Sequence, residues 1–272
     1  MTSDDGSLDR LRREPPAFRR VDVAAVAPRN PHLVAMTLSG PELVGFDIGL
    51  PAASVRLLLP RQGRTDLVIP TWNGNEFRHD DGQRPLLRTL TPRRNDHEAG
   101  TLDVEIVVHE GGPMSEWAMI AQPGDPAAIS GPGRGYEISS DATRFLLAGD
   151  ESASPAISQL LEALPRSAEV EVLLEVAHPD ARVDLPVHPG AAVRWVDLPA
   201  ETRPGDALLS AVAASELLGG SEDATADGLK VWVAGEAAAV QRIRKHLFEE
   251  RGLTRTQAVV RGYWKHGRSG AA

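Results

Sequence analysis

The chain has 272 residues and a formal net charge of −9, with 42% hydrophobic and 25% charged residues. This composition is typical of a globular protein long enough for two domains, and the acidic balance argues against general nucleic-acid binding. No apolar run approaches the length of a membrane helix, and the polar N-terminus does not resemble a signal peptide. We therefore expect no membrane span and a cytoplasmic location.

The chain contains no cysteine and eight histidines. The absence of cysteine excludes disulfides, thiolate nucleophiles and cysteine-held iron–sulfur clusters, so redox chemistry would need an organic cofactor. The histidines show no paired metal-ligand spacing, and we expect no structural metal.

Short strand-like segments, separated by Pro, Gly and Asn or Asp, fill the first half of the chain. Residues 1–16 are polar and arginine-rich, and we predict a flexible leader there. Residues 17–140 are predicted to form an antiparallel β-barrel with one short helix. The predicted strands are residues 20–26, 32–39, 54–59, 66–69, 86–91 and 102–109.

Apolar strands alternate with helical segments after residue 141, which is typical of a parallel sheet flanked by helices. Residues 141–272 are therefore predicted to form a Rossmann-like α/β domain. The predicted strands are residues 145–148, 170–176, 193–196, 231–234 and 258–262, and the predicted helices are residues 154–164, 204–218 and 236–251. No Gly-x-Gly-x-x-Gly motif follows any of these strands, so the usual dinucleotide fingerprint is absent.

A glycine-rich turn follows the last predicted barrel strand. Gly111, Gly112 and Pro113 break that strand, and Ser115 is predicted to cap a helix over residues 116–121. Free backbone N–H groups and the positive end of a helix dipole suit a pyrophosphate, and Arg88 on a nearby strand could supply the counter-charge. The alternative interpretation is an ordinary capped helix.

The C-terminal end of the chain is basic. From residue 251 onward it carries five Lys or Arg side chains and one His but no acid: Arg251, Arg255, Arg261, Lys265, His266 and Arg268. This pattern predicts either a solvated tail or a local site for an anionic ligand.

Several segments spread over both halves, taken together, carry a resemblance to a known family. They are residues 88–91 (Arg-Thr-Leu-Thr), 109–118, 123–125, 131–132, 148–156, 233–236 and 262–265 (Gly-Tyr-Trp-Lys). In this order they resemble the siderophore-interacting proteins, which are flavin-dependent ferric-siderophore reductases of the ferredoxin–NADP reductase superfamily. The resemblance implies an FAD-binding barrel followed by an NAD(P)H-binding α/β domain.

The resemblance also implies a flavin site on the barrel. Arg88 would pair with the FAD phosphates, and Thr91 would lie beside the flavin ring. The family usually has a stacked tyrosine where this chain has Leu90, and this departure is expected to weaken FAD binding or shift its potential. The implied cofactor-binding residues of the barrel are Arg88, Thr89, Leu90, Thr91, His109, Gly112, Met114, Ser115 and Trp117. For Trp117 a core role is an equal alternative.

The second half would hold the electron donor. The resemblance puts Asp150, Ser152 and Glu236 near the nicotinamide and the flavin, and Trp264 either near the flavin or at the end of the sheet. Asp150 and Glu151 would alternatively cap the following helix. Glu175 is a candidate ribose partner and Arg182 a candidate 2′-phosphate partner, but they do not decide between NADH and NADPH. Ferredoxin as the donor also stays open.

The implied substrate is an anionic ferric siderophore of the catecholate type. The cations expected to bind it are Arg56, Arg134, Lys265, His266 and Arg268. The predicted function is electron transfer from NAD(P)H through FAD to Fe(III), by a monomer or weak dimer. Two alternatives remain: a siderophore carrier without tight flavin binding and without turnover, or an NAD(P)H:flavin reductase with another acceptor.

Overall fold

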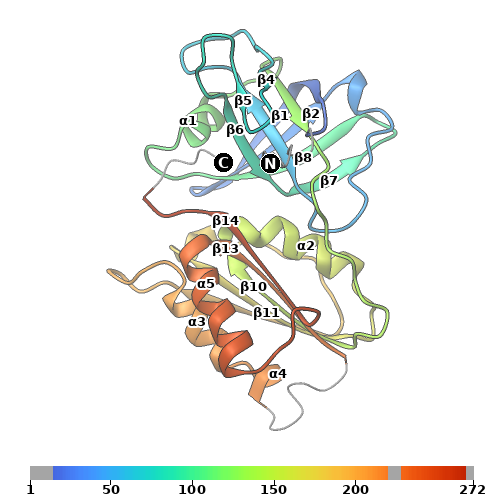
Figure 1. Ribbon diagram of the computed structural model, residues 1–272, viewed down its shortest axis with the longest axis vertical. Helices are drawn as coiled ribbons and strands as arrows, with labels where there is room; N and C mark the ends of the chain where they lie inside the picture. The colour runs from blue at the N-terminus through green and yellow to red at the C-terminus, as the bar shows by residue number, and fades with distance from the viewer. Residues whose placement is uncertain (1–14, 220–227, 268–272) are drawn as a thin grey trace, which may run out of the picture.

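The computed structural model describes residues 15–219 and 228–267. It shows two stacked halves, an antiparallel sheet above and a parallel sheet with helices below (Figure 1). We call residues 15–140 the barrel half and residues 141–267 the α/β half. Strand β14 runs up to the seam between them, and helix α2 lies along that seam.

The barrel half is a seven-stranded sheet in the order β6-β3-β9-β1-β2-β8-β7. Its two edge strands, β6 and β7, are consecutive in the chain, so the sheet curls until its edges meet at a corner formed by Thr91. In chain order the elements are β1 (Phe18–Asn30), β2 (Leu33–Ser39), a 3-10 helix (Pro41–Leu43), β3 (Val55–Leu59), a ribbon of β4 (Thr71–Trp72) and β5 (Phe77–Arg78), β6 (Leu86–Leu90), β7 (Pro92–Asp96), β8 (Thr101–Val107), α1 (Pro113–Ile120) and β9 (Pro126–Ser130).

Alternating side chains build the barrel core. In β8 every second residue (Leu102, Val104 and Ile106) is buried, as expected for a strand with one face inward. These residues pack with inward side chains of the other strands and with Met114 and Ala118 of α1. Helix α1 therefore closes one end of the barrel.

Several features of the barrel differ from the sequence-based prediction, among them the β4–β5 ribbon, which was not predicted. Residues 66–69 form no strand: Leu67 is buried against Leu58 and Ala128 on the outer face of the sheet, and this packing of a loop produced the apolar pattern. Strands β7 and β9 were missed. Strand β7 is polar because it lies at an edge, and β9 begins with proline and is rich in alanine.

The α/β half is a five-stranded parallel sheet in the order β12-β11-β10-β13-β14. Its elements are β10 (Arg144–Asp150), a 3-10 helix (Glu151–Ala153), α2 (Ser154–Ala163), β11 (Glu169–Val176), a 3-10 helix (Pro179–Ala181), β12 (Ala191–Asp197), α3 (Asp206–Ala213), α4 (Glu216–Gly219), β13 (Leu229–Glu236), α5 (Ala237–Lys245), a π-helical turn (His246–Glu250) and β14 (Ala258–Trp264). All five predicted strands are present. The predicted helix over residues 204–218 is instead two helices, and the one over residues 236–251 ends in the π-helical turn.

The strand order creates a switch point next to the central strand. From β10 the chain moves outward through β11 and β12, then returns to place β13 on the other side of β10. In open α/β sheets ligands bind at the carboxyl ends of the strands at such a point. We call the space beyond the carboxyl ends of β10 and β13 the crevice. Helix α2 covers one face of the sheet, and α3 and α5 cover the other.

Polar contacts fasten the two halves together. The buried side chain of Gln159 in α2 donates to the Pro92 carbonyl and accepts from the Ala52 N–H, each at 2.7 Å. The Arg261 guanidinium of β14 donates to the carbonyls of Ala52, Arg134 and Gly135. At the seam, side chains of the α/β half thus form hydrogen bonds with backbone groups of the barrel half.

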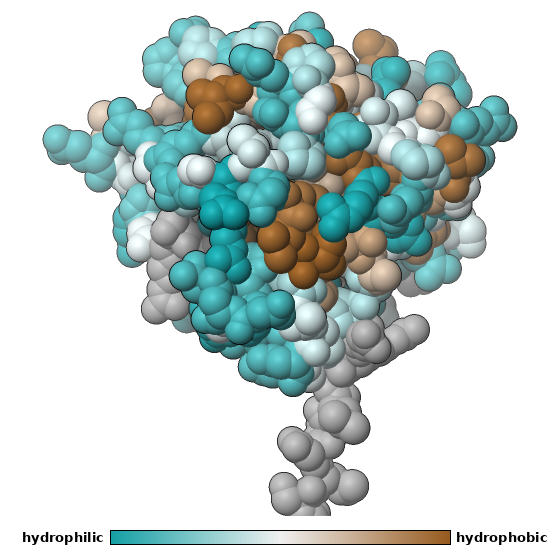
Figure 2. Space-filling model, turned by 90° about the horizontal axis from the view of Figure 1, so that it is seen from above, coloured by the Kyte–Doolittle hydropathy of each residue, from teal (hydrophilic) through white to brown (hydrophobic). Residues whose placement is uncertain are grey.

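The outer surface is mainly hydrophilic. Seen from above the barrel, an apolar patch near the centre and several smaller apolar areas lie among hydrophilic side chains (Figure 2). Within residues 15–219 and 228–267, no helix combines the length and the apolar character needed to cross a bilayer.

Candidate functional site

Arg88 lies on β6, the edge strand of the barrel sheet. Its neighbour across the strand pair is Leu57, a core residue, whereas Arg56 is paired with Thr89. Side chains directly opposite in an antiparallel pair share a face, so Arg88 and Arg56 lie on opposite faces of the sheet. The hydrogen bond found for the Arg88 guanidinium is to the carbonyl of Leu87, at 2.9 Å.

The charge of Arg88 is half-buried and not neutralised. No acidic side chain of the described residues pairs with it, and partial burial lowers the pKa of its guanidinium. A half-desolvated cation with unused donors favours an anionic ligand, because charge-assisted hydrogen bonds would replace the lost water.

Helix α1 packs against β6, the strand that carries Arg88. Gly112 is the N-cap of this helix and Pro113 is its first residue. Proline loses nothing there because its missing N–H would have had no partner within the helix. The N–H groups of Met114 and Ser115 belong to the first turn and have no intrahelical acceptor. Arg88 and the start of α1 together suit a phosphate or diphosphate group.

Ser115 is not the helix cap that the sequence predicted. It lies inside the first turn of α1 and is buried, and its hydroxyl accepts from the His109 N–H at 3.1 Å and faces the Val107 carbonyl at 3.5 Å. Ser115 therefore ties the start of α1 to the end of β8. Glycine rather than serine caps the helix because the chain turns tightly after Gly111, whose φ is +70°.

The other barrel candidates divide between surface and core. The exposed His109 ring lies directly over Gly112, where any Cβ would overlap it. The side chain of Met114 is buried, and Trp117 packs against the barrel core. Leu90 also packs against that core. Met114 and Trp117 thus contribute to folding, and Met114 offers a ligand only its backbone.

Thr91 lies at the corner where the barrel meets the α/β half. It is buried, and its hydroxyl is 3.4 Å from the hydroxyl of Tyr263 in β14. Burial raises the pKa of Tyr263. No role was predicted for Tyr263, although it belongs to the Gly-Tyr-Trp-Lys segment that supported the resemblance.

Asp150 ends β10 at the crevice and is surrounded by donors. Its carboxylate accepts from the N–H and the hydroxyl of Ser152, the N–H of Glu236 and the Trp264 indole. Burial raises the pKa of Asp150, and these hydrogen bonds oppose that rise. Asp150 caps the short 3-10 helix after β10, as one sequence interpretation proposed. Glu151 does not cap it, because its carboxylate accepts from the Ala177 N–H.

Two further acids of the α/β half cap helices. The buried Glu236 accepts from the Ala239 N–H and caps α5, while its other oxygen accepts from the His266 N–H. Glu175 is buried and accepts from the N–H groups of Gly205 and Leu208 at the start of α3. Both carboxylate oxygens of Glu175 thus serve the fold, and its ribose role stays a prediction.

The proposed 2′-phosphate partner is also already paired. The Arg182 guanidinium donates to both carboxylate oxygens of Asp197, at 2.6 and 2.7 Å. It is an exposed ion pair at the surface rather than an isolated cation.

The candidate substrate cations lie on segments that the backbone connects along the seam. Arg56 of β3 is paired with Ser130 of β9. The turn after Ser130 stays next to β3, where the Gly133 N–H donates to the Ser54 carbonyl. This turn carries the exposed Arg134, whose carbonyl is bound by Arg261 of β14, the strand that leads to Lys265. Among the described residues no acid pairs with Arg56, Arg134 or Lys265 within 4.0 Å. His266 follows Lys265, and Arg268 lies outside the described residues.

Two residues of the basic C-terminal end serve the fold instead. Arg261 is committed to three barrel carbonyls, as described above. Arg251 donates to the carbonyls of Ala213 and Leu218 and to the His246 ring. The basic end is thus neither wholly a solvated tail nor wholly a ligand site.

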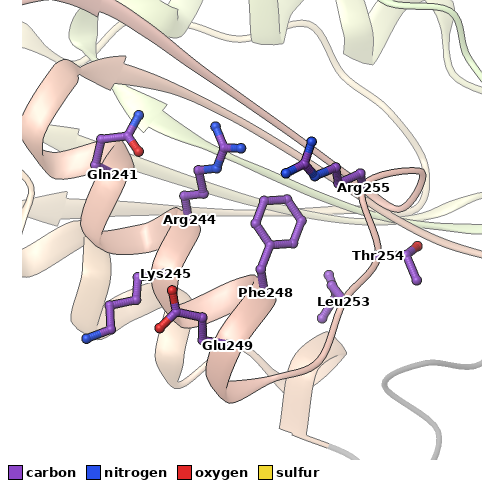
Figure 3. A pocket seen from close by; sticks show the side chains of 8 residues that line it. All are labelled: Gln241, Arg244, Lys245, Phe248, Glu249, Leu253, Thr254 and Arg255. Atoms are coloured by element: carbon purple, nitrogen blue, oxygen red, sulfur yellow. The ribbon is translucent and has the colours of Figure 1, made fainter.

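A separate basic pocket of about 520 Å³ lies between α5 and the loop before β14. Figure 3 shows Arg244 and Arg255 reaching toward each other above the Phe248 ring. Because this loop precedes β14, the pocket lies at the edge of the sheet opposite to the crevice. Its cations therefore do not belong to the candidate site.

The two halves match two family models. Residues 22–136 match the siderophore-interacting FAD-binding domain, and residues 142–267 match the siderophore-interacting protein model. The architecture is also that of solved ferredoxin reductases. The chain belongs to the siderophore-interacting protein family, as the sequence resemblance implied.

Relatives of similar length support this assignment. A siderophore utilization protein from T. fusca has a TM-score of 0.81 and 32% identity, covering 95% of this chain and 97% of that one. The siderophore-interacting protein SipS from Aeromonas hydrophila has a TM-score of 0.73 and 30% identity, covering 93% of this chain and 100% of that one. The ferric vibriobactin reductase ViuB of Vibrio cholerae is 31% identical over 240 residues, which is 88% of this chain and 86% of ViuB.

Proposed function

We propose that this protein is an FAD-dependent ferric-siderophore reductase that takes electrons from NAD(P)H. The observation that carries the proposal is the half-buried, unneutralised Arg88 on β6, a strand packed against α1, whose first turn has free N–H groups. The similarity to ViuB, a ferric vibriobactin reductase, supports the reaction class. The proposal requires a compartment that holds NAD(P)H, such as the cytoplasm.

The residues present fit the diphosphate of FAD. Arg88 would neutralise one side, and the N–H groups of Met114 and Ser115 would bind the other. Gly112 has no side chain because the His109 ring lies where a Cβ would stand, so the glycine allows the turn and the ring to pack together. Thr91 would lie near the flavin ring. Bound FAD would accept a hydride and release single electrons, chemistry that no side chain of this chain can supply.

The α/β half would bind and orient the donor. In the crevice, Ser152 and the end of β13 line the position expected for a nicotinamide. The carboxylates of Glu236 and Glu175 hold helices in place there. The structure offers no free cation at Arg182 for a 2′-phosphate, so the choice between NADH, NADPH and ferredoxin is left to experiment.

The cationic side chains along the seam would bind a negatively charged substrate. Arg56, Arg134, Lys265 and His266 are proposed to bind a ferric siderophore of the catecholate type, whose oxygens carry several negative charges. Reduction weakens the complex because Fe(II) matches hard anionic oxygens less well than Fe(III) does. The reduced iron then leaves as product.

Leu90 favours a second candidate function. Without an aromatic ring at this position, the chain would lose a stacking surface for the flavin, at a cost on the order of 1 kcal/mol. A protein with weak flavin affinity could act as a siderophore carrier without turnover. A flavin reductase with another electron acceptor is the remaining alternative.

The visible absorbance of the purified protein under anaerobic conditions tests the proposal. We expect a flavin band that bleaches with NADH or NADPH and recovers when a ferric siderophore is added. A band that neither nucleotide bleaches would point to another donor such as ferredoxin. The absence of a band after incubation with FAD would overturn the flavoenzyme and leave the carrier.

Charge reversal separates the two enzyme interpretations. Arg56→Glu and Lys265→Glu are expected to lower the rate of reduction of an anionic ferric siderophore at least about tenfold, while a small neutral acceptor is reduced as before. Arg255→Glu, in the pocket on the opposite edge of the sheet, is the matched control and should change neither rate. Equal losses with both acceptors would contradict a substrate role for these cations.

A further inference from the structure

The carboxylate of Asp150 joins three segments at the crevice. Its Oδ1 atom accepts from the Ser152 N–H at 3.0 Å and the Ser152 hydroxyl at 2.5 Å. Its Oδ2 atom accepts from the Glu236 N–H at 2.7 Å and from Nε1 of Trp264 at 2.8 Å. All four contacts use Asp150 as acceptor, so an ionised carboxylate satisfies them and a neutral group of the same size does not.

The surrounding backbone leaves no room for another arrangement. A Cβ at Gly235 would lie 2.5 Å from Oδ2 of Asp150, and one at Gly149 would lie 2.6 Å from the Ala234 carbonyl oxygen. Gly235 also has a φ of +154°, which side chains rarely adopt. The ends of β10 and β13 are therefore packed around this carboxylate, and the Trp264 indole is fixed with them.

Trp264 is partly open to solvent at this point. The residue is 40% exposed although its indole N–H is bound to a buried acid. The exposed Lys265 and His266 follow it, and the His266 N–H donates to Glu236 at 3.1 Å. The rings of Trp264 and His266 are 6.3 Å apart. Two buried acids thus fix a segment that presents one aromatic side chain, the cation of Lys265 and the imidazole of His266.

We infer that Asp150 is a positioning residue that fixes Trp264, so that the Trp264 ring and the adjacent Lys265 and His266 form one platform for a planar aromatic anion. The inference rests on the proposed function for the identity of that anion, a catecholate ring of the siderophore. An aromatic face suits a flat ring, and the neighbouring cations suit its oxygens. Asp150 itself is buried behind the indole and need not touch the ligand.

Binding of a complex that cannot be reduced tests the platform apart from turnover. The probe is gallium(III) tris-catecholate, because Ga(III) has the charge of Fe(III) but accepts no electron under these conditions. Trp264→Phe keeps an aromatic ring but removes the N–H donor together with one ring of the indole, and Asp150→Asn keeps the size of the acid. Each substitution is expected to weaken binding of this probe to the full-length protein by roughly five- to tenfold.

A double-mutant cycle tests whether Asp150 affects probe binding through Trp264. If Asp150 acts through Trp264, the double variant binds the probe no more weakly than the weaker single variant does. Additive losses would overturn the inference. Cleavage by trypsin after Lys265 should also be faster in Asp150→Asn, because the segment is released. Faster cleavage with unchanged probe binding would overturn the platform as well.

Controls distinguish a variant that does not fold from a result that contradicts the inference. Asp197→Asn removes an exposed acid at the end of β12 and should leave probe binding unchanged. If Asp150→Asn does not fold, Trp264→Phe with unchanged thermal stability carries the test alone, and unchanged binding in that variant counts against the inference. A colourless wild-type protein that still shows these effects would overturn the reductase but keep the platform.

Discussion

Tyr136 illustrates how burial changes the chemistry of a single residue. Its side chain packs in the core of the α/β half although it precedes that half in the chain, and it is 7% exposed. Desolvation of the phenolate raises the pKa of Tyr136 to about 12, and the nearby Arg261 opposes this rise. The residue is therefore neutral at any physiological pH and contributes to stability as an apolar side chain.

The raised pKa predicts a loss of stability in alkali. In the unfolded chain Tyr136 ionises near pH 10, whereas in the folded protein it stays neutral until about pH 12. The folded state thus keeps the proton longer, and its free energy of unfolding falls as pH rises between these values, by up to about 3 kcal/mol. Urea unfolding over this pH range should show a shallower decline for Tyr136→Phe than for the wild type. Parallel curves would contradict the assigned burial.

At the scale of elements, the junction between β8 and α1 determines the shape of the candidate phosphate site. Ser115 links the end of the strand to the first turn of the helix through His109 and Val107. Without this link the His109 N–H would be buried in the turn without an acceptor. The hydroxyl therefore fixes where the free N–H groups of α1 point.

Ser115→Ala is expected to loosen this junction. Loss of a buried hydroxyl that serves two backbone groups should lower the free energy of unfolding by about 1–2 kcal/mol and weaken FAD binding in parallel. Denaturant unfolding and flavin titration measure the two effects. Ser210→Ala, which removes an exposed hydroxyl bonded within α3, is the control and should change neither. A stable variant with normal flavin affinity would show that the hydroxyl does not shape the site.

At the scale of the whole molecule, the seam determines whether the flavin and nicotinamide regions face each other. Gln159 reaches from α2 into the barrel and satisfies both Ala52 and Pro92. Arg93 and Glu162 add an ion pair across the same seam, but Glu162 is largely exposed. A buried link of this kind contributes more than an exposed ion pair, because water cannot replace it.

Gln159→Leu is expected to uncouple the halves. The substitution leaves the Ala52 N–H and the Pro92 carbonyl buried without partners, which should cost about 2–3 kcal/mol at the seam. Calorimetry should show the single thermal transition broaden or split into two as the halves melt separately. Glu162→Gln, at the exposed ion pair, should change stability by about 0.5 kcal/mol or less. One sharp transition in Gln159→Leu would contradict the role assigned to this seam.

Much of the architecture was predictable from local sequence alone. The change from short strands to alternating strands and helices near residue 141 indicated the two sheets, because strand and helix periodicity depend on residues close together in the chain. The Arg88 segment and the glycine turn at residues 111–113 were also recognisable locally. Their roles in cofactor binding stay predictions, although the structure packs the strand of Arg88 against the helix that follows the turn.

The tertiary structure alone decided how the polar side chains are used. Glu175 lies 30 residues from Gly205, Asp150 lies 114 residues from Trp264, and Arg261 lies 126 residues from Gly135. The sequence shows which of these side chains can donate or accept but not which partner packing will bring within reach. A buried polar group must find a partner wherever the fold encloses it, so the assignment of Glu175 to a helix cap and of Asp150 to Trp264 follows from burial rather than from local pattern.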